Sequence, residues 1–151
     1  MHSLKLCQQY FVAVNERNLE RIGALFAPDA TVLSPIISGA LNVRDFHQRL
    51  FEDMQHTLTK IKTVFGSVNS VASIALHFSH TWTLADGKVV NFDGVNIFEL
   101  TPDGTRFTKL TIICDTTSVR PHLAESQRYR SSRGNWNFRP SLDRFSVECQ
   151  A

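Results

Sequence analysis

Residues 10–35, YFVAVNERNLERIGALFAPDATVLSP, contain the pattern that decides the fold. Apolar residues at positions 7, 10, 11 and 14 follow the i, i+3, i+4, i+7 spacing of an amphipathic helix. Asn18 can cap a second, short helix, and Pro28 is expected to end it. A strand is predicted to begin at Ala30. The stretch therefore predicts two helices that lead into the first strand of a sheet.

The following residues predict a third helix and then long strands. The third helix is expected to start at Asn42, where Asp45 three residues on makes a near capping box. From residue 74 the apolar pattern changes to a period of two, which predicts strands over 74–84, 88–100 and 107–115. The dipeptide Asp86-Gly87 indicates a hairpin turn between the first two. Three helices before an antiparallel sheet predict an α+β fold of two layers.

Composition and charge exclude several classes of protein. At 151 residues, with 42% hydrophobic and 20% charged residues, the chain fits one globular domain. No apolar run is long enough to cross a bilayer, and the N-terminus lacks the apolar core of a signal peptide. The net charge of +2 gives no support to nucleic-acid binding. Three cysteines without metal-type spacing, Cys7, Cys114 and Cys149, are interpreted as reduced thiols of a cytoplasmic protein without a metal site.

The last part of the chain differs from the rest. We predict that residues 1–117 form the domain and that residues 118–151 form a basic tail, because this segment has six arginines against three acidic residues. A short helix is expected over residues 122–130. The aperiodic remainder is expected either to dock on the domain or to be disordered.

The hairpin predicts which polar residues meet. If Asp86 and Gly87 alone form the turn, His80 lies opposite Asp93 and His77 lies opposite Asn96. A histidine that a polar neighbour can orient is suited to general acid/base chemistry. Because side chains alternate between the faces of a strand, only one of the two pairs can point inward.

The apolar residues of the two strands favour the His80/Asp93 pair as the inward one. The face that carries this pair also carries Leu76, Phe78, Trp82, Val95 and Ile97. An apolar sheet face can equally serve a dimer interface, so this argument leaves the His77/Asn96 pair open.

Two segments carry a resemblance to a known family. Residues 93–98, DGVNIF, resemble the GVDVF segment of SnoaL-like polyketide cyclases, and residues 10–15, YFVAVN, resemble the first helix of ketosteroid isomerases. Residues 5–117 thus resemble the NTF2-like superfamily, whose members fold into a cystatin-like cone of three helices on a curved antiparallel sheet. The resemblance implies that Tyr10 and Asn96 hold a substrate oxygen, that Phe46 is a pocket wall and that His47 hydrogen-bonds Tyr10. It places Asn96, and with it His77, inside the cone.

The departures from the family change the expected chemistry. Ser34, before Pro35, stands where the isomerases hold their aspartate base, and Ile112 stands where SnoaL-type cyclases hold a catalytic aspartate. A histidine is therefore expected to move the proton, in a site similar to those of scytalone dehydratases. Ser34, Ile112 and Trp82 are expected to contact the substrate.

These observations predict a cofactor-independent isomerase, cyclase or dehydratase. It would act by acid/base chemistry on a polycyclic or phenolic, polyketide-type intermediate, with His77 as the proton carrier. The alternative is a non-catalytic binder of small hydrophobic ligands or a dimeric assembly module, because an NTF2-like fold alone does not determine function. A homodimer packed through the sheet is expected, with no nucleic-acid or membrane partner.

Overall fold

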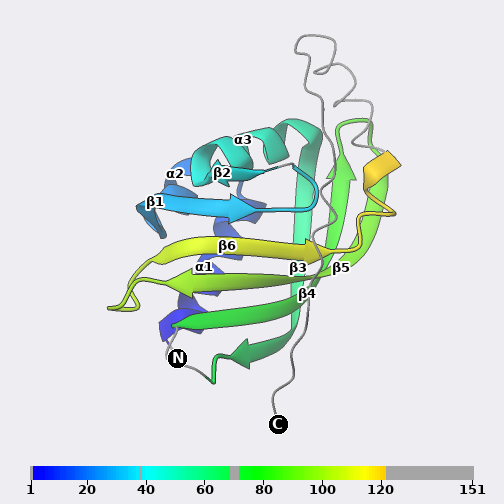
Figure 1. The fold of residues 1–151 in the computed structure, drawn as a ribbon. Helices are drawn as coiled ribbons and strands as arrows, with labels where there is room; N and C mark the ends of the chain where they lie inside the picture. Colours follow the sequence, from blue (N-terminus) through cyan, green and yellow to red (C-terminus); the bar gives the residue numbers. More distant parts are fainter. Residues whose placement is uncertain (1, 38, 69–71, 122–151) are drawn as a thin grey trace.

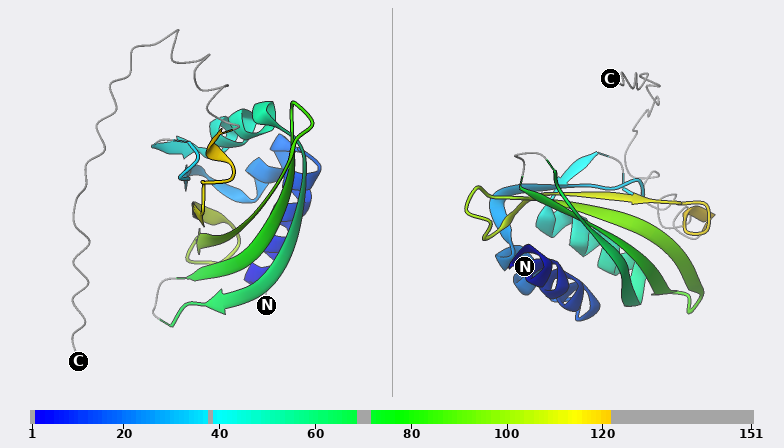
Figure 2. Two further views of the ribbon diagram at one scale, coloured as in Figure 1. Left: turned by 90° about the vertical axis from the view of Figure 1, so that its right-hand side faces the viewer. Right: turned by 90° about the horizontal axis from the view of Figure 1, so that it is seen from below.

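The computed structural model describes residues 2–37, 39–68 and 72–121. Three helices lie on the concave side of one curved, unclosed sheet (Figures 1 and 2). The elements in chain order are α1 (His2–Asn15), α2 (Leu19–Ala24), β1 (Phe26–Leu33), β2 (Ala40–Asn42), α3 (Val43–Asp53), β3 (Met54–Gly66), β4 (Ser73–Leu84), β5 (Val89–Leu100) and β6 (Phe107–Cys114). This arrangement confirms the predicted α+β cone.

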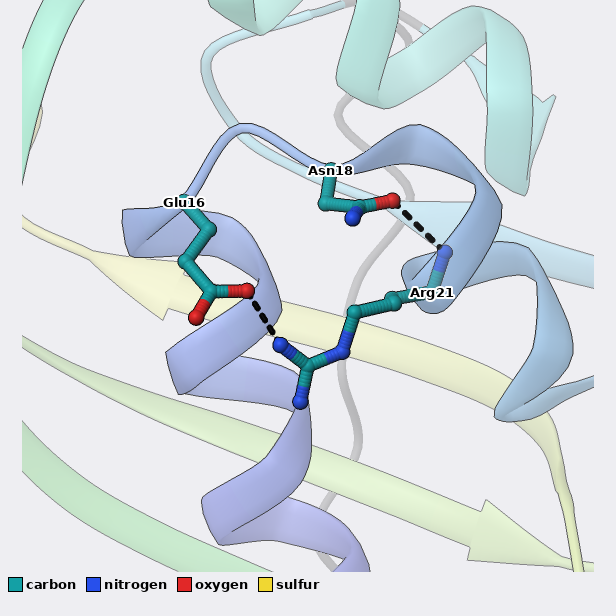
Figure 3. Close-up of polar contacts among 3 residues, drawn as sticks. All are labelled: Glu16, Asn18 and Arg21. Carbon is teal, nitrogen blue, oxygen red and sulfur yellow. Dashed lines mark hydrogen bonds and ion pairs between the residues drawn. The ribbon is translucent and has the colours of Figure 1, made fainter.

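The helix caps form where the sequence predicts them. The Asn18 side chain accepts a hydrogen bond of 3.0 Å from the Arg21 backbone N–H at the start of α2, and Glu16 pairs with the Arg21 guanidinium across the same turn (Figure 3). At α3 the Asn42 side chain accepts from the Asp45 N–H at 2.8 Å. Helix α2 ends at Ala24, before Pro28, which lies within β1. Its missing N–H is tolerated there because the pairing of β1 with β6 is irregular between Phe26 and Thr31.

The sheet has the strand order β2-β1-β6-β5-β4-β3. It is mixed rather than wholly antiparallel, because β1 pairs with β6 in parallel. The 13-residue strand β3 was not predicted, since it is an edge strand with few buried apolar residues. The sequence does carry a signal for it: positions 57, 59, 61 and 63 are all β-branched.

The β4–β5 hairpin corrects the predicted pairing by one residue. Ala85, Asp86 and Gly87 all belong to the loop, because the Leu84 N–H donates to the Lys88 carbonyl and the Gly87 N–H donates to the Leu84 carbonyl, each at 2.9 Å. Gly87 has a φ of 82°, the left-handed conformation that closes a three-residue hairpin loop. The predicted two-residue turn is therefore wrong.

The core lies between the helices and the concave face of the sheet. Val119, two residues past the predicted domain boundary, is fully buried in this core. The predicted helix at 122–130 and the rest of the tail lie outside the described residues. Among the helices that the structure describes, none is long and apolar enough to cross a membrane.

Candidate functional site

An apolar cavity lies between the helices and the concave face. It encloses about 450 Å³ of space not filled by protein atoms, its open mouth included, and the space that admits the centre of a water molecule is only about 30 Å³. A second, more open hollow shares the lining residues Ser34 and Ile112 with it. No Asp, Glu, Lys or Arg is among the described lining residues, which are Tyr10, Phe11, Val14, Ser34, Ile36, Phe46, Leu50, Met54, Phe78, His80, Trp82, Phe92, Asn96 and Ile112.

Most of the predicted site residues meet at this cavity. Three of them come from the first part of the chain: Tyr10 on α1, Ser34 directly after β1 and Phe46 on α3. The sheet contributes His80, Trp82, Asn96 and Ile112. His47 is fully buried behind Tyr10 and does not line the cavity itself.

The two predicted histidine pairs do not exist. His80 lies opposite Phe92, and His77 lies opposite Val95. Because the loop has one more residue than predicted, each pair is divided between the faces, and the inner face carries one member of each, His80 and Asn96.

His77 and Asp93 lie on the outer face. The His77 side chain is 35% exposed, and its Nε2 is 3.8 Å from Asp93 Oδ2. Lys62 donates to the same oxygen at 2.6 Å, and this hydrogen bond is the main cause that lowers the pKa of Asp93. The prediction that His77 faces the pocket is therefore wrong, and the three side chains form a polar cluster on the outer face.

His80 is a buried, neutral imidazole. Its Nδ1 is 2.8 Å from the Thr59 hydroxyl, directly across the β3–β4 pair. Its ring packs against Phe78 at 4.2 Å between centroids and against Phe92 at 5.3 Å. Burial lowers the pKa of His80 to about 4, because the charged form would lose its hydration. Thr59 was missed in the sequence because it lies on the unpredicted strand β3.

Tyr10, His47 and the Val43 carbonyl form a directed chain of hydrogen bonds. His47 Nδ1 is 2.7 Å from the Val43 oxygen, and Nε2 is 3.0 Å from the Tyr10 oxygen. A carbonyl can only accept, so Nδ1 carries the hydrogen. Burial lowers the pKa of His47 to about 4, so its ring is neutral at pH 7 and Nε2 has a lone pair. The Tyr10 hydroxyl therefore donates to His47.

The direction of the hydrogen bond between Tyr10 and His47 changes the role expected for Tyr10. Burial, assisted by the nearby Cys7, raises the pKa of the Tyr10 phenol, which stays protonated. Its single hydrogen is used in the bond to His47, so its oxygen offers only lone pairs to the cavity that it lines. The oxyanion-donor role that the resemblance implies for Tyr10 is not supported by this geometry.

Of the buried side-chain oxygens without a partner among the described residues, the one on a cavity-lining residue belongs to Asn96. Its side chain is buried, with 2% of the residue exposed, and its Oδ1 has no hydrogen-bond partner among the described residues. An unpaired buried carbonyl typically costs about 1–3 kcal/mol. A partner supplied by a ligand would remove that cost.

The two buried histidines predict a stability that falls in mild acid. The folded protein holds both histidines neutral with pKa values of about 4, whereas the ordinary histidine pKa of 6.5 applies in the unfolded chain. Between pH 7 and pH 5 the unfolded chain therefore binds more protons, and the free energy of unfolding should drop by roughly 2 kcal/mol for each histidine. Urea unfolding at the two pH values measures the drop, and the His80→Gln variant should show about half of it. Equal urea midpoints for the native sequence at pH 7 and pH 5 would contradict this assignment.

Comparison with known proteins gives the family. The family model described as the SnoaL-like domain matches residues 7–109. The chain therefore belongs to the SnoaL-like family, and its fold is NTF2-like. No curated protein matches the sequence.

Solved structures share the fold at low sequence identity. An NTF2-like protein of unknown function from Exiguobacterium sp. 255-15 is 19% identical, with a TM-score of 0.63 over 74% of this chain and 99% of that one. TerC, co-crystallised with polyporic acid, is 13% identical, with a TM-score of 0.70 over 82% and 99%. The epoxide hydrolase/cyclase-like enzyme SalBIII is 18% identical, with a TM-score of 0.64 over 78% and 97%. At these identities the likeness shows a common fold.

Proposed function

We propose that this protein is a cofactor-independent isomerase, cyclase or dehydratase that moves a proton on a small, largely apolar polyketide-type molecule. One observation carries the proposal: a neutral buried imidazole, His80, and an amide with an unpaired oxygen, Asn96, line the same apolar cavity. An apolar pocket with a few convergent polar groups is typical of small-molecule sites. Similar folds occur in SalBIII and in TerC, which was co-crystallised with polyporic acid.

In the proposed reaction His80 is the proton carrier, in place of His77. The step requires the tautomer in which Nδ1–H donates to the Thr59 hydroxyl, 2.8 Å away. The Nε2 lone pair then takes a proton from carbon, and the electrons of the broken C–H bond move to the substrate oxygen. Imidazolium and enolate then stabilise each other in the low-dielectric cavity, which raises the basicity of His80 during the step. Return of the proton to another carbon completes an isomerisation. Asn96 would hold the substrate oxygen through its side-chain N–H, because the enolate oxygen has no hydrogen and Oδ1 can only accept.

Deuterium incorporation tests the proposal. The protein is incubated in heavy water with a panel of enolisable bicyclic and polycyclic ketones, 1-tetralone first, and mass is followed with time. We expect exchange above the protein-free background, with a rate that falls below about pH 4, where His80 becomes protonated. A panel without exchange at any pH would contradict the proposal.

Non-catalytic binding is the second candidate, and the narrow cavity without a carboxylate among its described residues favours it. A panel member that raises the melting temperature but never exchanges would support this candidate. The exchange experiment with a parallel melting curve therefore separates the two functions.

The homodimer stays a prediction. Exposed apolar side chains on the outer face of the sheet favour it: Phe65 is 50% exposed and Ile113 is 54% exposed. Phe65 pairs with Ala75 and Ala75 with Ile97, so apolar residues continue across three strands. A sedimentation mass of one 17.1 kDa chain would contradict it.

A further inference from the structure

We infer that the cavity selects a neutral ligand that donates a hydroxyl hydrogen, a hydroxylated aromatic ring or an enol, over ligands that only accept hydrogen bonds. The inference rests on the proposed function for its placement of the ligand, and it adds the chemical class. Two hydrogen-bond acceptors at the cavity and the lack of charged side chains among its described lining residues support it.

The first acceptor is the Tyr10 oxygen. The Val43 carbonyl orients His47, and His47 uses the Tyr10 hydrogen, with donor–acceptor distances of 2.7 Å and 3.0 Å. Reversing the chain needs a second hydrogen on His47, which burial opposes by lowering the pKa of its ring. A ligand oxygen without a hydrogen would meet lone pairs at Tyr10, whereas a ligand hydroxyl can donate to them.

The second acceptor is Asn96 Oδ1. It is buried in a residue that lines the cavity and has no partner among the described residues. No described residue satisfies it, so a donor from the ligand gains a hydrogen bond there without breaking one within the protein.

The lack of charged side chains among the described lining residues restricts the class of ligand further. The described lining residues include no lysine or arginine, and both nearby histidines are neutral at pH 7. A carboxylate ligand would be buried without a counter-charge, which is strongly unfavourable. The favoured ligand is therefore uncharged and hydroxylated.

Calorimetric binding of a matched pair tests the inference on the intact native chain. The probes are 2-naphthol and 2-methoxynaphthalene, which differ in the donor hydrogen and a methyl group, with 2-naphthoate as the charged comparison. We expect 2-naphthol to bind at least about tenfold more tightly than either. Equal affinities, tighter binding of the ether or the acid, or no binding of 2-naphthol up to 1 mM would each overturn the inference.

Two variants test whether the Tyr10 and Asn96 oxygens cause the preference for a hydroxyl donor. In Tyr10→Phe and Asn96→Leu the advantage of 2-naphthol over the ether should shrink at least severalfold, while affinity for the ether changes little. Asn91→Leu, on the outer face of the same strand, is the matched control and should keep the full advantage. Melting curves confirm folding, and nitrogen NMR of the native His47 ring should show hydrogen on Nδ1 alone. A hydrogen on Nε2 would overturn the Tyr10 part directly.

The outcomes distinguish this inference from the proposed function. Hydroxyl preference without deuterium exchange on any substrate supports the ligand class and contradicts catalysis. Exchange on ketones without hydroxyl preference supports catalysis and overturns the ligand class.

Discussion

Replacing His80 by glutamine is expected to lower the rate of deuterium exchange by at least about 100-fold, because positioned general bases contribute factors of that order. Glutamine retains a polar group that can reach Thr59 but has no basic nitrogen. His77→Gln is the matched control: it lies three residues away on the same strand, and its side chain is on the outer face, 3.8 Å from Asp93. This control should exchange within about twofold of the native rate, as surface changes usually have small effects.

Melting curves of both variants at pH 7 are measured together with the exchange rates. They distinguish a variant that has lost catalysis from one that has lost its fold. A rate that falls in His77→Gln and persists in folded His80→Gln would show that the reaction occurs on the outer face. The account of the cavity as a catalytic site would then be wrong.

Replacing Gly94 by alanine is the second change with a large expected effect. A Cβ at this position would lie 2.8 Å from Phe78 Cζ and 3.0 Å from the Ile113 carbonyl. Phe78 is fully buried, and its ring packs against Phe11 at 5.7 Å and His80 at 4.2 Å between centroids, so it has little room to move. We expect the free energy of unfolding to fall by about 1–3 kcal/mol, because an extra carbon in a well-packed core typically costs that much stability.

Urea unfolding measures the cost, with Gly23→Ala as the control. Gly23 is an exposed residue of α2, and a Cβ there meets nothing within 4 Å. That change should leave stability unchanged or raise it by up to about 1 kcal/mol, because alanine is the better helix former. An unchanged urea midpoint for Gly94→Ala would show that the Phe78 ring moves freely.

The helix caps and the strand periodicity were predictable because they depend on local interactions. Asn18 and Asn42 bond backbone groups three residues away, and alternation from Ile74 to Leu84 reflects burial of one strand face. The edge strand β3 gave a weaker signal, since threonines rather than large apolar residues stand at two of its inner positions, Thr57 and Thr59. The parallel β1–β6 pair joins distant segments, which no local pattern specifies.

The hairpin shows how one residue decides a site. Asp86-Gly87 fits a two-residue turn and also a three-residue loop with glycine in the left-handed conformation, so the dipeptide does not choose between them. A one-residue change of register moves His77 outward and His80 inward. The resemblance placed Tyr10 and Asn96 at the cavity, but the donor direction at Tyr10 depends on the Val43 carbonyl and could not be inferred from residue types.

Ligands are expected to bind beside His80 and Asn96 and not beside His77. The direct measurement is NMR of the histidine side chains and the Asn96 amide, titrated with the tightest-binding member of the exchange panel. We expect ligand-dependent shifts of the His80 ring and the Asn96 side chain, with the His77 ring unchanged. Shifts at His77 with none at His80 would contradict it.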